Sequence, residues 1–265
     1  MDNHNQLKLS VIIPAHNEEK NINETASRII PLLVREKIPF ELLLVNDNSA
    51  DGTLAVLRDL ARKYEMVRIV DRTPPNGFGR AVRAGLNSFD GDVVMIVMAD
   101  LSDDPNDIVK YYRKIEEGYD CVFGSRFLKA SVVEDYPLLK LLVNRVVNRM
   151  LQLLFMTRHN DLTNAFKAYR AEVIRNIMPL QASHFNITIE LSLSALIRGY
   201  RISQVPINWY GRKWGASKLS LQAMGRRYLA TLIKIWFEKL LIMDDLMTDM
   251  DARAKNASTE GKQNS

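Results

Sequence analysis

The sequence predicts an α/β fold with a mostly parallel central sheet. Short apolar runs alternate with segments of helical periodicity through the first half of the chain, a pattern typical of parallel sheets covered by helices on both faces. The length of 265 residues fits one large α/β domain. A hydrophobic fraction of 47% and a charged fraction of 25% are those of an ordinary globular protein, so we expect disorder only at the ends.

Five apolar runs are predicted as strands. They cover residues 9–14 (LSVIIP), 40–45 (FELLLV), 66–70 (MVRIV), 92–98 (DVVMIVM) and 121–125 (CVFGS). Runs of this length, bounded by turn residues, are typical of strands buried on both faces. Because 92–98 is the most apolar of the five, we place it at the centre of the sheet.

Helices are predicted between these strands. They cover about residues 19–35, 51–63 and 106–117, and a further helix opens at the segment PPNGFG and runs to about Ser88. Polar clusters follow four of the strands, at 14–19, 46–51, 99–105 and 124–126. In such sheets ligands bind beyond the carboxyl ends of the strands, so we expect the functional residues in these clusters.

The second half of the chain is predicted to contain two amphipathic helices. Residues 138–156 are strongly apolar, but polar side chains recur in them at helical spacing, which favours an amphipathic helix over a membrane span. Residues 219–247 repeat this pattern, and both segments combine a broad apolar face with Lys or Arg, as interfacial helices do. The alternative is that each packs its apolar stripe inside the protein. Residues 249–265 are predicted to be a disordered tail.

The amino-acid composition limits the partners and metal ligands that the chain can have. The net charge of +5 suits anionic partners such as phosphates or acidic lipid, although a solvated surface explains it equally well. Basic residues are not interleaved with aromatic ones on one face, so we do not expect nucleic-acid binding.

Cys121 is the only cysteine, which excludes a disulfide framework. A metal would then have oxygen ligands, so we expect Mg²⁺ or Mn²⁺. The first ten residues lack the features of a signal peptide, so we expect a cytoplasmic location.

Aspartates stand out in two of the polar clusters. Asp100 directly follows the predicted central strand, where burying a carboxylate costs free energy unless the group has a binding role or a partner. Asp103 lies on the same short loop. For Asp104 we favour capping of the helix that begins near residue 105. In the cluster at 46–51, Asp47 is placed to accept hydrogen bonds from a nucleobase, whereas Asp51 is better placed as a cap.

Six motifs carry a family resemblance. They are SVIIPAHNEE, LLVNDNSADGT, MADLSDDP, GSRF, DLTNAFKAYR and RKWGASKL. In this order they resemble the motifs of family-2 glycosyltransferases, and the last two narrow the resemblance to dolichyl-phosphate mannose synthases and related polyprenyl-phosphate enzymes. The similarity covers roughly residues 8–240. It implies a Rossmann-like catalytic domain of the GT-A type over 8–218, followed by the C-terminal amphipathic helix.

The resemblance also implies roles for individual residues. Positions expected to line the nucleotide pocket and contact the base are Pro14, Ala15, Glu18 and Asp47. Asp100 is expected to hold the metal bound to the diphosphate, with Asp103 or Ser102 as a further ligand. Residues expected around the phosphate groups are Arg126, Arg212, Lys218 and, beside them, Ser217. Asp161 is expected to shape the acceptor end of the site. Glu190 matches an acidic family position, and the alternative for it is an ion-paired helix residue.

Two departures from the family pattern affect the metal and the base. Met98-Ala99-Asp100 stands where the family usually has Asp-Ala-Asp, so one acid is lost. Asn46-Asp47 stands where two adjacent acids are common, but the acid expected to contact the base is kept. The first departure bears on metal affinity and geometry, and it suggests a catalytically impaired nucleotide-sugar-binding subunit as one alternative function. The presence of the other expected site residues argues against this alternative; they are Asp47, Asp100, Arg126, Arg212 and Lys218.

The expected function is inverting transfer of a hexose from GDP-mannose or a UDP-hexose to a polyprenyl phosphate at the cytoplasmic face of a membrane. A lipid phosphate is already ionised near neutral pH, so catalysis needs alignment and charge neutralisation rather than a general base. The alternative is a family-2 enzyme with a glycan or other hydroxyl acceptor, which needs a base. Expected partners are the two substrates, the membrane surface, and a membrane-anchoring subunit or a second copy of the chain.

Overall fold

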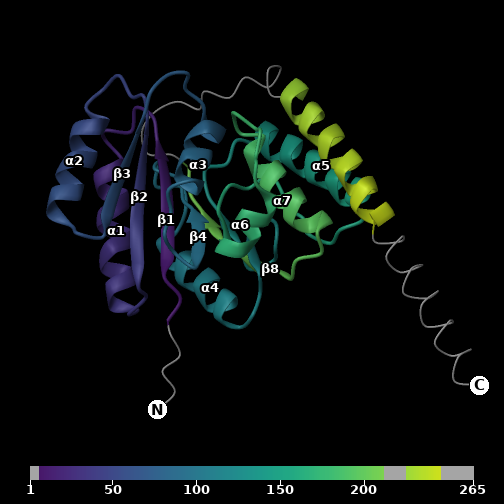
Figure 1. The fold of residues 1–265 in the computed structure, drawn as a ribbon, viewed down its shortest axis with the longest axis horizontal. Helices are drawn as coiled ribbons and strands as arrows, with labels where there is room; N and C mark the ends of the chain where they lie inside the picture. Colours follow the sequence, from purple (N-terminus) through teal and green to yellow (C-terminus); the bar gives the residue numbers. More distant parts are fainter. Residues whose placement is uncertain (1–5, 212–224, 246–265) are drawn as a thin grey trace, which may run out of the picture.

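Alternating apolar strands and amphipathic helices build a three-layer fold in which helices cover both faces of one sheet (Figure 1). The structure is a computed structural model that describes residues 6–211 and 225–245. Its first half follows the predicted order. The elements are β1 (Leu9–Ala15), α1 (Ile22–Arg35), β2 (Phe40–Asp47), α2 (Thr53–Lys63), β3 (Val67–Arg72), α3 (Phe78–Leu86), β4 (Val93–Ile96), α4 (Pro105–Glu116) and β5 (Cys121–Ser125).

The second half adds short strands and longer helices. The elements are β6 (Val132–Val133), α5 (Leu138–Phe155), β7 (Lys167–Arg170), α6 (Ala171–Ile177), α7 (Ile187–Ile197), β8 (Ile202–Pro206) and β9 (Asn208–Trp209). Residues 225–245 form a further helix. Helix α5 lies where the sequence predicts an amphipathic helix at 138–156. The helix at 225–245 lies within the predicted helix at 219–247, whose two ends, like the predicted tail at 249–265, lie outside the described residues.

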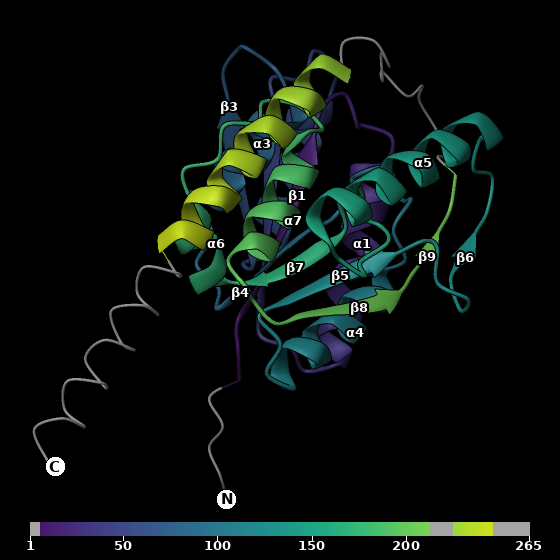
Figure 2. The same cartoon turned by 90° about the vertical axis from the view of Figure 1, so that its right-hand side faces the viewer.

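The strands of the described residues form a seven-stranded sheet in the order β3-β2-β1-β4-β7-β5-β8. Every pairing is parallel except the two made by β7, which runs antiparallel between β4 and β5. The mostly parallel sheet and the central place of β4 agree with the sequence prediction. A separate pair, β6 and β9, lies beyond this sheet near α5 (Figure 2).

Two apolar layers hold the helices to the sheet. Along β1, Val11 and Ile13 enter one layer and Ile12 enters the other, because successive side chains of a strand point to opposite faces. The first layer is shared with α1, α2 and α4, and the second with α3, α5, α6, α7 and the helix at 225–245. The carboxyl ends of β1, β2, β4 and β5 are thereby fixed along one edge of the sheet.

Both amphipathic helices also expose apolar side chains. Leu138, Leu153 and Met156 are each more than 80% exposed on and just after α5. On the helix at 225–245, Phe237 and Leu241 are more than half exposed. Among the described residues, no helix combines the length and the apolar character that crossing a membrane requires.

Candidate active site

The predicted nucleotide-binding and metal-binding residues that the structure describes lie at the carboxyl edge of the sheet. Strands β1 and β2 are in parallel register, with Ala15 beside Asn46, so the two polar clusters that follow them start at the same level. The loop after β4, which holds Asp100, leaves the sheet on the other side of β1. The clusters that the sequence places after separate strands are therefore brought together, as expected for a parallel sheet.

Asp47 ends β2 and is almost fully buried. Its Oδ2 accepts a hydrogen bond from the Gly77 amide at 2.7 Å, and its Oδ1 is ion-paired with Arg72. His16 contacts the Asp47 carbonyl through Nδ1 at 2.9 Å. Gly77 is required by close packing, because a Cβ there would lie 2.3 Å from the Ser183 carbonyl oxygen. Asp47 is thus held rigidly at the start of α3, with Arg72 as its counter-charge.

The loop after β1 is organised by hydrogen bonds between its own side chains and α2. Pro14 and Ala15 are buried at the end of β1. The Glu18 amide donates to Thr53 Oγ1 at 2.9 Å, and the Glu18 carboxylate accepts from Asn21 Nδ2 at 2.6 Å. These bonds fix the loop against the first turn of α2, beside Asp47.

Asp104 has the capping contact that the sequence predicts, whereas the N-cap of α2 is Gly52 and Asp51 lies one residue before it. Asp51 Oδ1 accepts from the Thr53 amide at 3.0 Å at the start of α2. Asp104 is the N-cap of α4, where its Oδ1 accepts from the Asn106 amide at 3.0 Å. Its other oxygen accepts from Asn208 Nδ2, which ties the helix start to β9.

Asp100 and Asp103 lie on the loop between β4 and α4, and both are buried. Asp100 Oδ1 accepts from the Ser102 amide at 3.2 Å, and Asp103 Oδ2 accepts from the Met98 amide at 3.0 Å. Burial raises the pKa of the Asp103 carboxyl to about 7, and the negative charges of Asp100 and Asp107 act in the same direction. Two carboxylates are therefore held close enough to repel each other.

This pair fits a divalent cation that is shared with a diphosphate. Mg²⁺ is commonly bound by one or two carboxylates together with substrate phosphates. A cation would relieve the repulsion between Asp100 and Asp103. In the part of the chain that the structure describes, no three His, Cys, Asp or Glu side chains form a group that could hold a metal ion. The donor set thus fits a metal completed by the substrate, not one enclosed by the protein alone.

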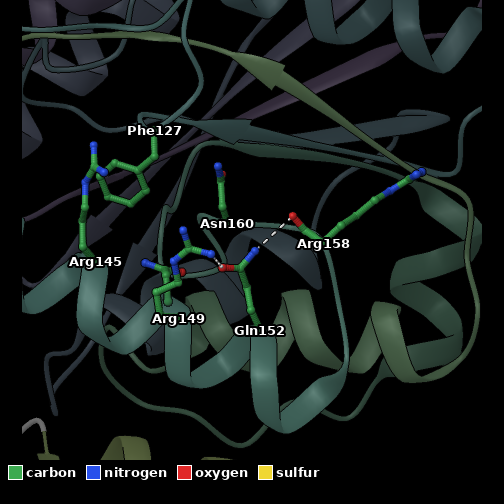
Figure 3. Close-up of a pocket in the computed structure, with 7 residues that line it drawn as sticks. Phe127, Arg145, Arg149, Gln152, Arg158 and Asn160 are labelled. Carbon is green, nitrogen blue, oxygen red and sulfur yellow. Dashed lines mark hydrogen bonds between the residues drawn. The ribbon is translucent and has the colours of Figure 1, made fainter.

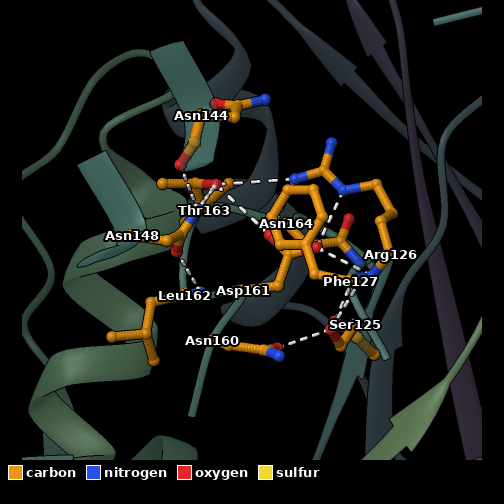
Figure 4. Close-up of polar contacts among 12 residues, drawn as sticks. Ser125, Arg126, Phe127, Asn144, Asn148, Asn160, Asp161, Leu162, Thr163 and Asn164 are labelled. Carbon is orange, nitrogen blue, oxygen red and sulfur yellow. Dashed lines mark hydrogen bonds and ion pairs between the residues drawn. The ribbon is translucent and has the colours of Figure 1, made fainter. Parts of the chain in front are cut away.

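Arg126 and Asp161 form a buried ion pair after β5 (Figure 4). Arg126 donates from Nε to Asp161 Oδ2 at 2.8 Å and from Nη2 to Asp161 Oδ1 at 2.7 Å. Its Nη1 donates to the Tyr136 hydroxyl at 3.2 Å. Such a bidentate pair fixes the plane of the guanidinium group. The two residues that the resemblance assigns to phosphate and to the acceptor end are therefore direct partners.

Lys167 is a buried cation beside this pair that sequence reasoning missed. It lies on β7 and is 1% exposed, and its Nζ donates to the carbonyl oxygens of Leu162, at 2.8 Å, and Asn164. Burial lowers the pKa of the Lys167 ammonium to about 7, with Arg126 acting in the same direction and Asp161 against it. No carboxylate of the described residues forms an ion pair with it.

Glu190 is buried and ion-paired, which is the alternative considered for it. Its carboxylate accepts from the amides of Gln181, at 3.0 Å, and Ala182, at 2.7 Å. Lys234, on the helix at 225–245, pairs with Glu190 at 2.7 Å. Glu190 thus links the segment before α7 to the C-terminal helix. The Ser183 carbonyl of that same segment packs against Gly77, next to Asp47.

Three predicted phosphate contacts, Arg212, Ser217 and Lys218, lie outside the described residues. Of the residues that sequence reasoning missed, Arg72 had a detectable signal. It lies two positions beyond the predicted strand at 66–70 and in register with Asp47 on the neighbouring strand. Tyr136, which contacts Arg126, had no comparable signal.

The chain is similar to known proteins over most of its length. The model of the family described as glycosyl transferase family 2 matches residues 10–178. A dolichol-phosphate mannosyltransferase from Pyrococcus furiosus is 33% identical over 217 residues, which are 80% of this chain and 59% of that protein. A polyprenol monophosphomannose synthase from Mycolicibacterium smegmatis is 30% identical over 220 residues, 79% of this chain and 80% of that protein.

Solved structures are similar in fold at lower identity. A glucosyl-3-phosphoglycerate synthase from Mycobacterium tuberculosis, crystallised with Mn²⁺, UDP and phosphoglyceric acid, has a TM-score of 0.66 and 22% identity. The match covers 87% of this chain and 78% of that one. The likeness confirms the predicted GT-A-type fold.

Proposed function

The chain belongs to glycosyltransferase family 2, and we propose that it transfers a hexose from a nucleotide sugar to a polyprenyl phosphate with inversion at the anomeric carbon. One observation carries the proposal. Along the sheet edge, in the order β2, β1, β4 and β5, lie Asp47, the loop after Ala15, the pair Asp100–Asp103, and Arg126. The residues are thus arranged in the order in which they would meet the base of the nucleotide sugar, its diphosphate and an anionic acceptor.

The donor end is the part around Asp47 and the loop after β1. Asp47 is preorganised by Gly77 and Arg72, so it can accept hydrogen bonds from a base without first being ordered. Mg²⁺ or Mn²⁺ would be held by Asp100 and Asp103 and would supply positive charge to the diphosphate that departs. The names of the two curated relatives support mannose, and hence GDP-mannose, as the first donor to test.

The acceptor end is the part around Arg126. A phosphate oxygen is nucleophilic near neutral pH without proton removal, so alignment of this oxygen with the anomeric carbon is the main requirement. Asp161 fixes the Arg126 guanidinium, and the one Nη1 hydrogen that does not bond to Tyr136 can meet the acceptor phosphate. Arg212 and Lys218, expected from the motif RKWGASKL, would add positive charge to the same site.

The exposed apolar faces of α5 and of the helix at 225–245 support a lipid acceptor. Both lie on the same face of the sheet (Figure 2). They are in contact where the Lys239 ammonium lies over the Phe155 ring, 5.9 Å from its centroid. Apolar faces bordered by basic residues are typical of helices that lie in a membrane interface. We therefore propose that the enzyme works at a membrane surface, on the cytoplasmic side expected from the sequence.

A hydroxyl acceptor is the second candidate, and one observation favours it. Asp103 lies on the loop between β4 and α4, at the middle of the row of site residues, and burial raises its pKa to about 7, so in the absence of a bound cation it is the carboxylate placed to act as a general base. The matched glucosyl-3-phosphoglycerate synthase shows that this fold is also found in a protein crystallised with a small phosphorylated acid.

The test is transfer of label into lipid. The protein in detergent would be incubated with labelled GDP-mannose or UDP-glucose and a polyprenyl phosphate, followed by organic extraction. We expect label in the organic phase with one donor, and its loss with chelator or in Asp100→Ala. Folding of that variant would be checked by its melting temperature. Label that enters only water-soluble products would contradict the lipid acceptor.

A further inference from the structure

A cavity of about 160 Å³ lies beside α5, next to the acceptor end of the proposed site (Figure 3). Besides Phe127, its lining residues are three arginines and three amides, namely Arg145, Arg149, Arg158, Asn148, Gln152 and Asn160. None of the described residues that line it is acidic. Arg126, the residue assigned above to the acceptor phosphate, is not among the lining residues, but its guanidinium lies 5.5 Å from the centroid of the Phe127 ring, so the cavity adjoins the acceptor end without containing it.

The arginines of the cavity lack acidic partners. Arg145 and Arg149 are one helical turn apart on α5, and no Asp or Glu of the described residues forms an ion pair with either of them. The Arg145 guanidinium lies over the Phe127 ring, 5.0 Å from its centroid. Gln152 accepts from Arg149 at 3.4 Å and donates to the Arg158 carbonyl, while the Arg158 side chain extends away from the cavity (Figure 3).

The amides add donors to this positive charge. Asn160 Oδ1 accepts from Ser125 Oγ at 2.6 Å, which orients the amide and leaves its NH₂ group as a donor. Guanidinium groups form paired hydrogen bonds with phosphate oxygens, and amide NH₂ groups can complete the set. A cavity with two guanidinium groups, a donor amide and no carboxylate is therefore suited to a phosphate group.

The position of the arginines on α5 indicates where the phosphate comes from. Asn148 and Leu151 mark the buried side of the helix. At 100° per residue, Arg145 and Arg149 lie at one border between that side and the exposed apolar side, where Val146 and Leu153 are found. In an interfacial helix this border is at the level of the lipid headgroups, which long basic side chains reach from the edge of the apolar face.

We propose that the cavity formed by Arg145, Arg149 and the neighbouring amides binds the headgroup phosphate of an anionic membrane lipid. This inference rests on the proposed function, because it takes the membrane surface as the place of the reaction. The bound lipid is not a substrate. It orients α5 in the interface, so that the acceptor end around Arg126 faces the membrane.

The experiment uses the full-length protein without donor or acceptor. Binding to phosphatidylcholine vesicles, with and without phosphatidylglycerol, would be measured by sedimentation for the wild type and for the double variant Arg145→Gln/Arg149→Gln. The control is Arg58→Gln/Arg175→Gln, which removes the same charge from exposed sites on α2 and α6. Melting temperatures would show that both double variants fold.

We expect the Arg145/Arg149 variant to lose about fivefold per arginine in binding to the anionic vesicles, and the control to change by no more than about twofold. Equal losses in both double variants would show diffuse attraction and overturn the proposal. The proposal would also be overturned if the Arg145/Arg149 variant bound the anionic vesicles as tightly as the wild type does. The same holds if the wild type bound vesicles with and without phosphatidylglycerol equally well.

Adding inorganic phosphate tests whether the cavity binds a free phosphate ion rather than the phosphate of a lipid headgroup. If it raises the melting temperature of the wild type but not of the Arg145/Arg149 variant, while vesicle binding is the same for both, the cavity takes a free phosphate and the lipid assignment is wrong. These outcomes are separate from the proposed function, because label transfer to a polyprenyl phosphate in detergent is measured without vesicles.

Discussion

Buried charges near the acceptor end differ in how they are neutralised. Arg126 and Asp161 neutralise each other at hydrogen-bond distance, and such a pair keeps its orientation because separating it leaves a buried charge. Among the described residues, Lys167 contacts two carbonyl oxygens and the face of the Phe123 ring, and it forms no ion pair with a carboxylate. Burial lowers its pKa to about 7, which gives the folded protein a pH-dependent stability.

The pH dependence of Lys167 has a definite sign. In the unfolded chain its pKa is near the usual value of about 10.4, so between pH 7 and pH 10 the unfolded state binds more protons than the native state. Stability therefore rises with pH in this window, by up to about 1.4 kcal/mol per pH unit. We predict that Lys167→Met is more stable than the wild type at pH 7 and that the difference shrinks by pH 9. Denaturant unfolding at both pH values measures it.

A matched variant controls for other groups that titrate. Lys129→Met replaces an exposed lysine, so its stability relative to the wild type should be the same at both pH values. If the difference in unfolding free energy between Lys167→Met and the wild type is also the same at pH 7 and pH 9, then Lys167 stays charged over this range and its pKa is not lowered to about 7.

Met98 stands next to the two carboxylates that would hold a metal. Its amide donates to Asp103 and Asp100 lies two residues on, so an acid at this position would add a third carboxylate to the pair Asp100–Asp103. We predict that Met98→Asp binds Mn²⁺ about tenfold more tightly in the absence of nucleotide, since affinity rises with ligand charge. Titration calorimetry measures this, and Met98→Asn is the uncharged control. Weaker binding by Met98→Asp would show that Asp100 and Asp103 do not form the metal site.

At the level of elements, two ion pairs tie the helix at 225–245 to α7 and the residue that follows it, and the pair Glu190–Lys234 contains the more deeply buried carboxylate. Glu190 on α7 binds Lys234 and two amides of the segment that packs on α3. A helix whose apolar residues are largely exposed gains less from burial than a core helix, so polar anchors matter more for its position. This anchor connects the helix at 225–245 to the glycine beside Asp47.

Removing the charge of Glu190 should loosen that helix. We predict that Glu190→Gln lowers stability by about 1–3 kcal/mol, less than a fully buried pair would cost, because Lys234 is 35% exposed. Hydrogen exchange should accelerate most in residues 225–245. The control is Glu238→Gln, which breaks the more exposed pair with Arg198 and should change exchange little. Equal effects of the two variants would contradict an anchoring role for Glu190.

The sequence predicted elements well where periodicity was strong. The five strands and four helices of the first half follow from apolar runs and helical spacing, and their ends differ by only a few residues. The antiparallel β7 was missed, because its four residues KAYR contain two charges and no alternation. Its place between β4 and β5 is set by pairing with distant strands, which local pattern does not contain.

At the level of the whole molecule, topology explains why the site could be located in part. The rule that ligands meet the carboxyl ends of parallel strands placed Asp47, Asp100 and Asp103 on one edge before any contact was known. The ion pairs between the site residues and their neighbours could not be predicted in the same way. That Arg126 pairs with Asp161, and Glu190 with Lys234, depends on side-chain packing between segments 35 and 44 residues apart.

The stereochemistry of the product tests the central claim most directly. Proton and phosphorus NMR of the lipid extracted after reaction with GDP-mannose would identify both the new bond and the anomeric configuration. We predict a glycosyl phosphodiester whose configuration is opposite to that of the donor, because the lipid phosphate attacks in one displacement. A sugar attached to a hydroxyl group, or a phosphodiester with the configuration of the donor, would contradict inverting transfer to a polyprenyl phosphate.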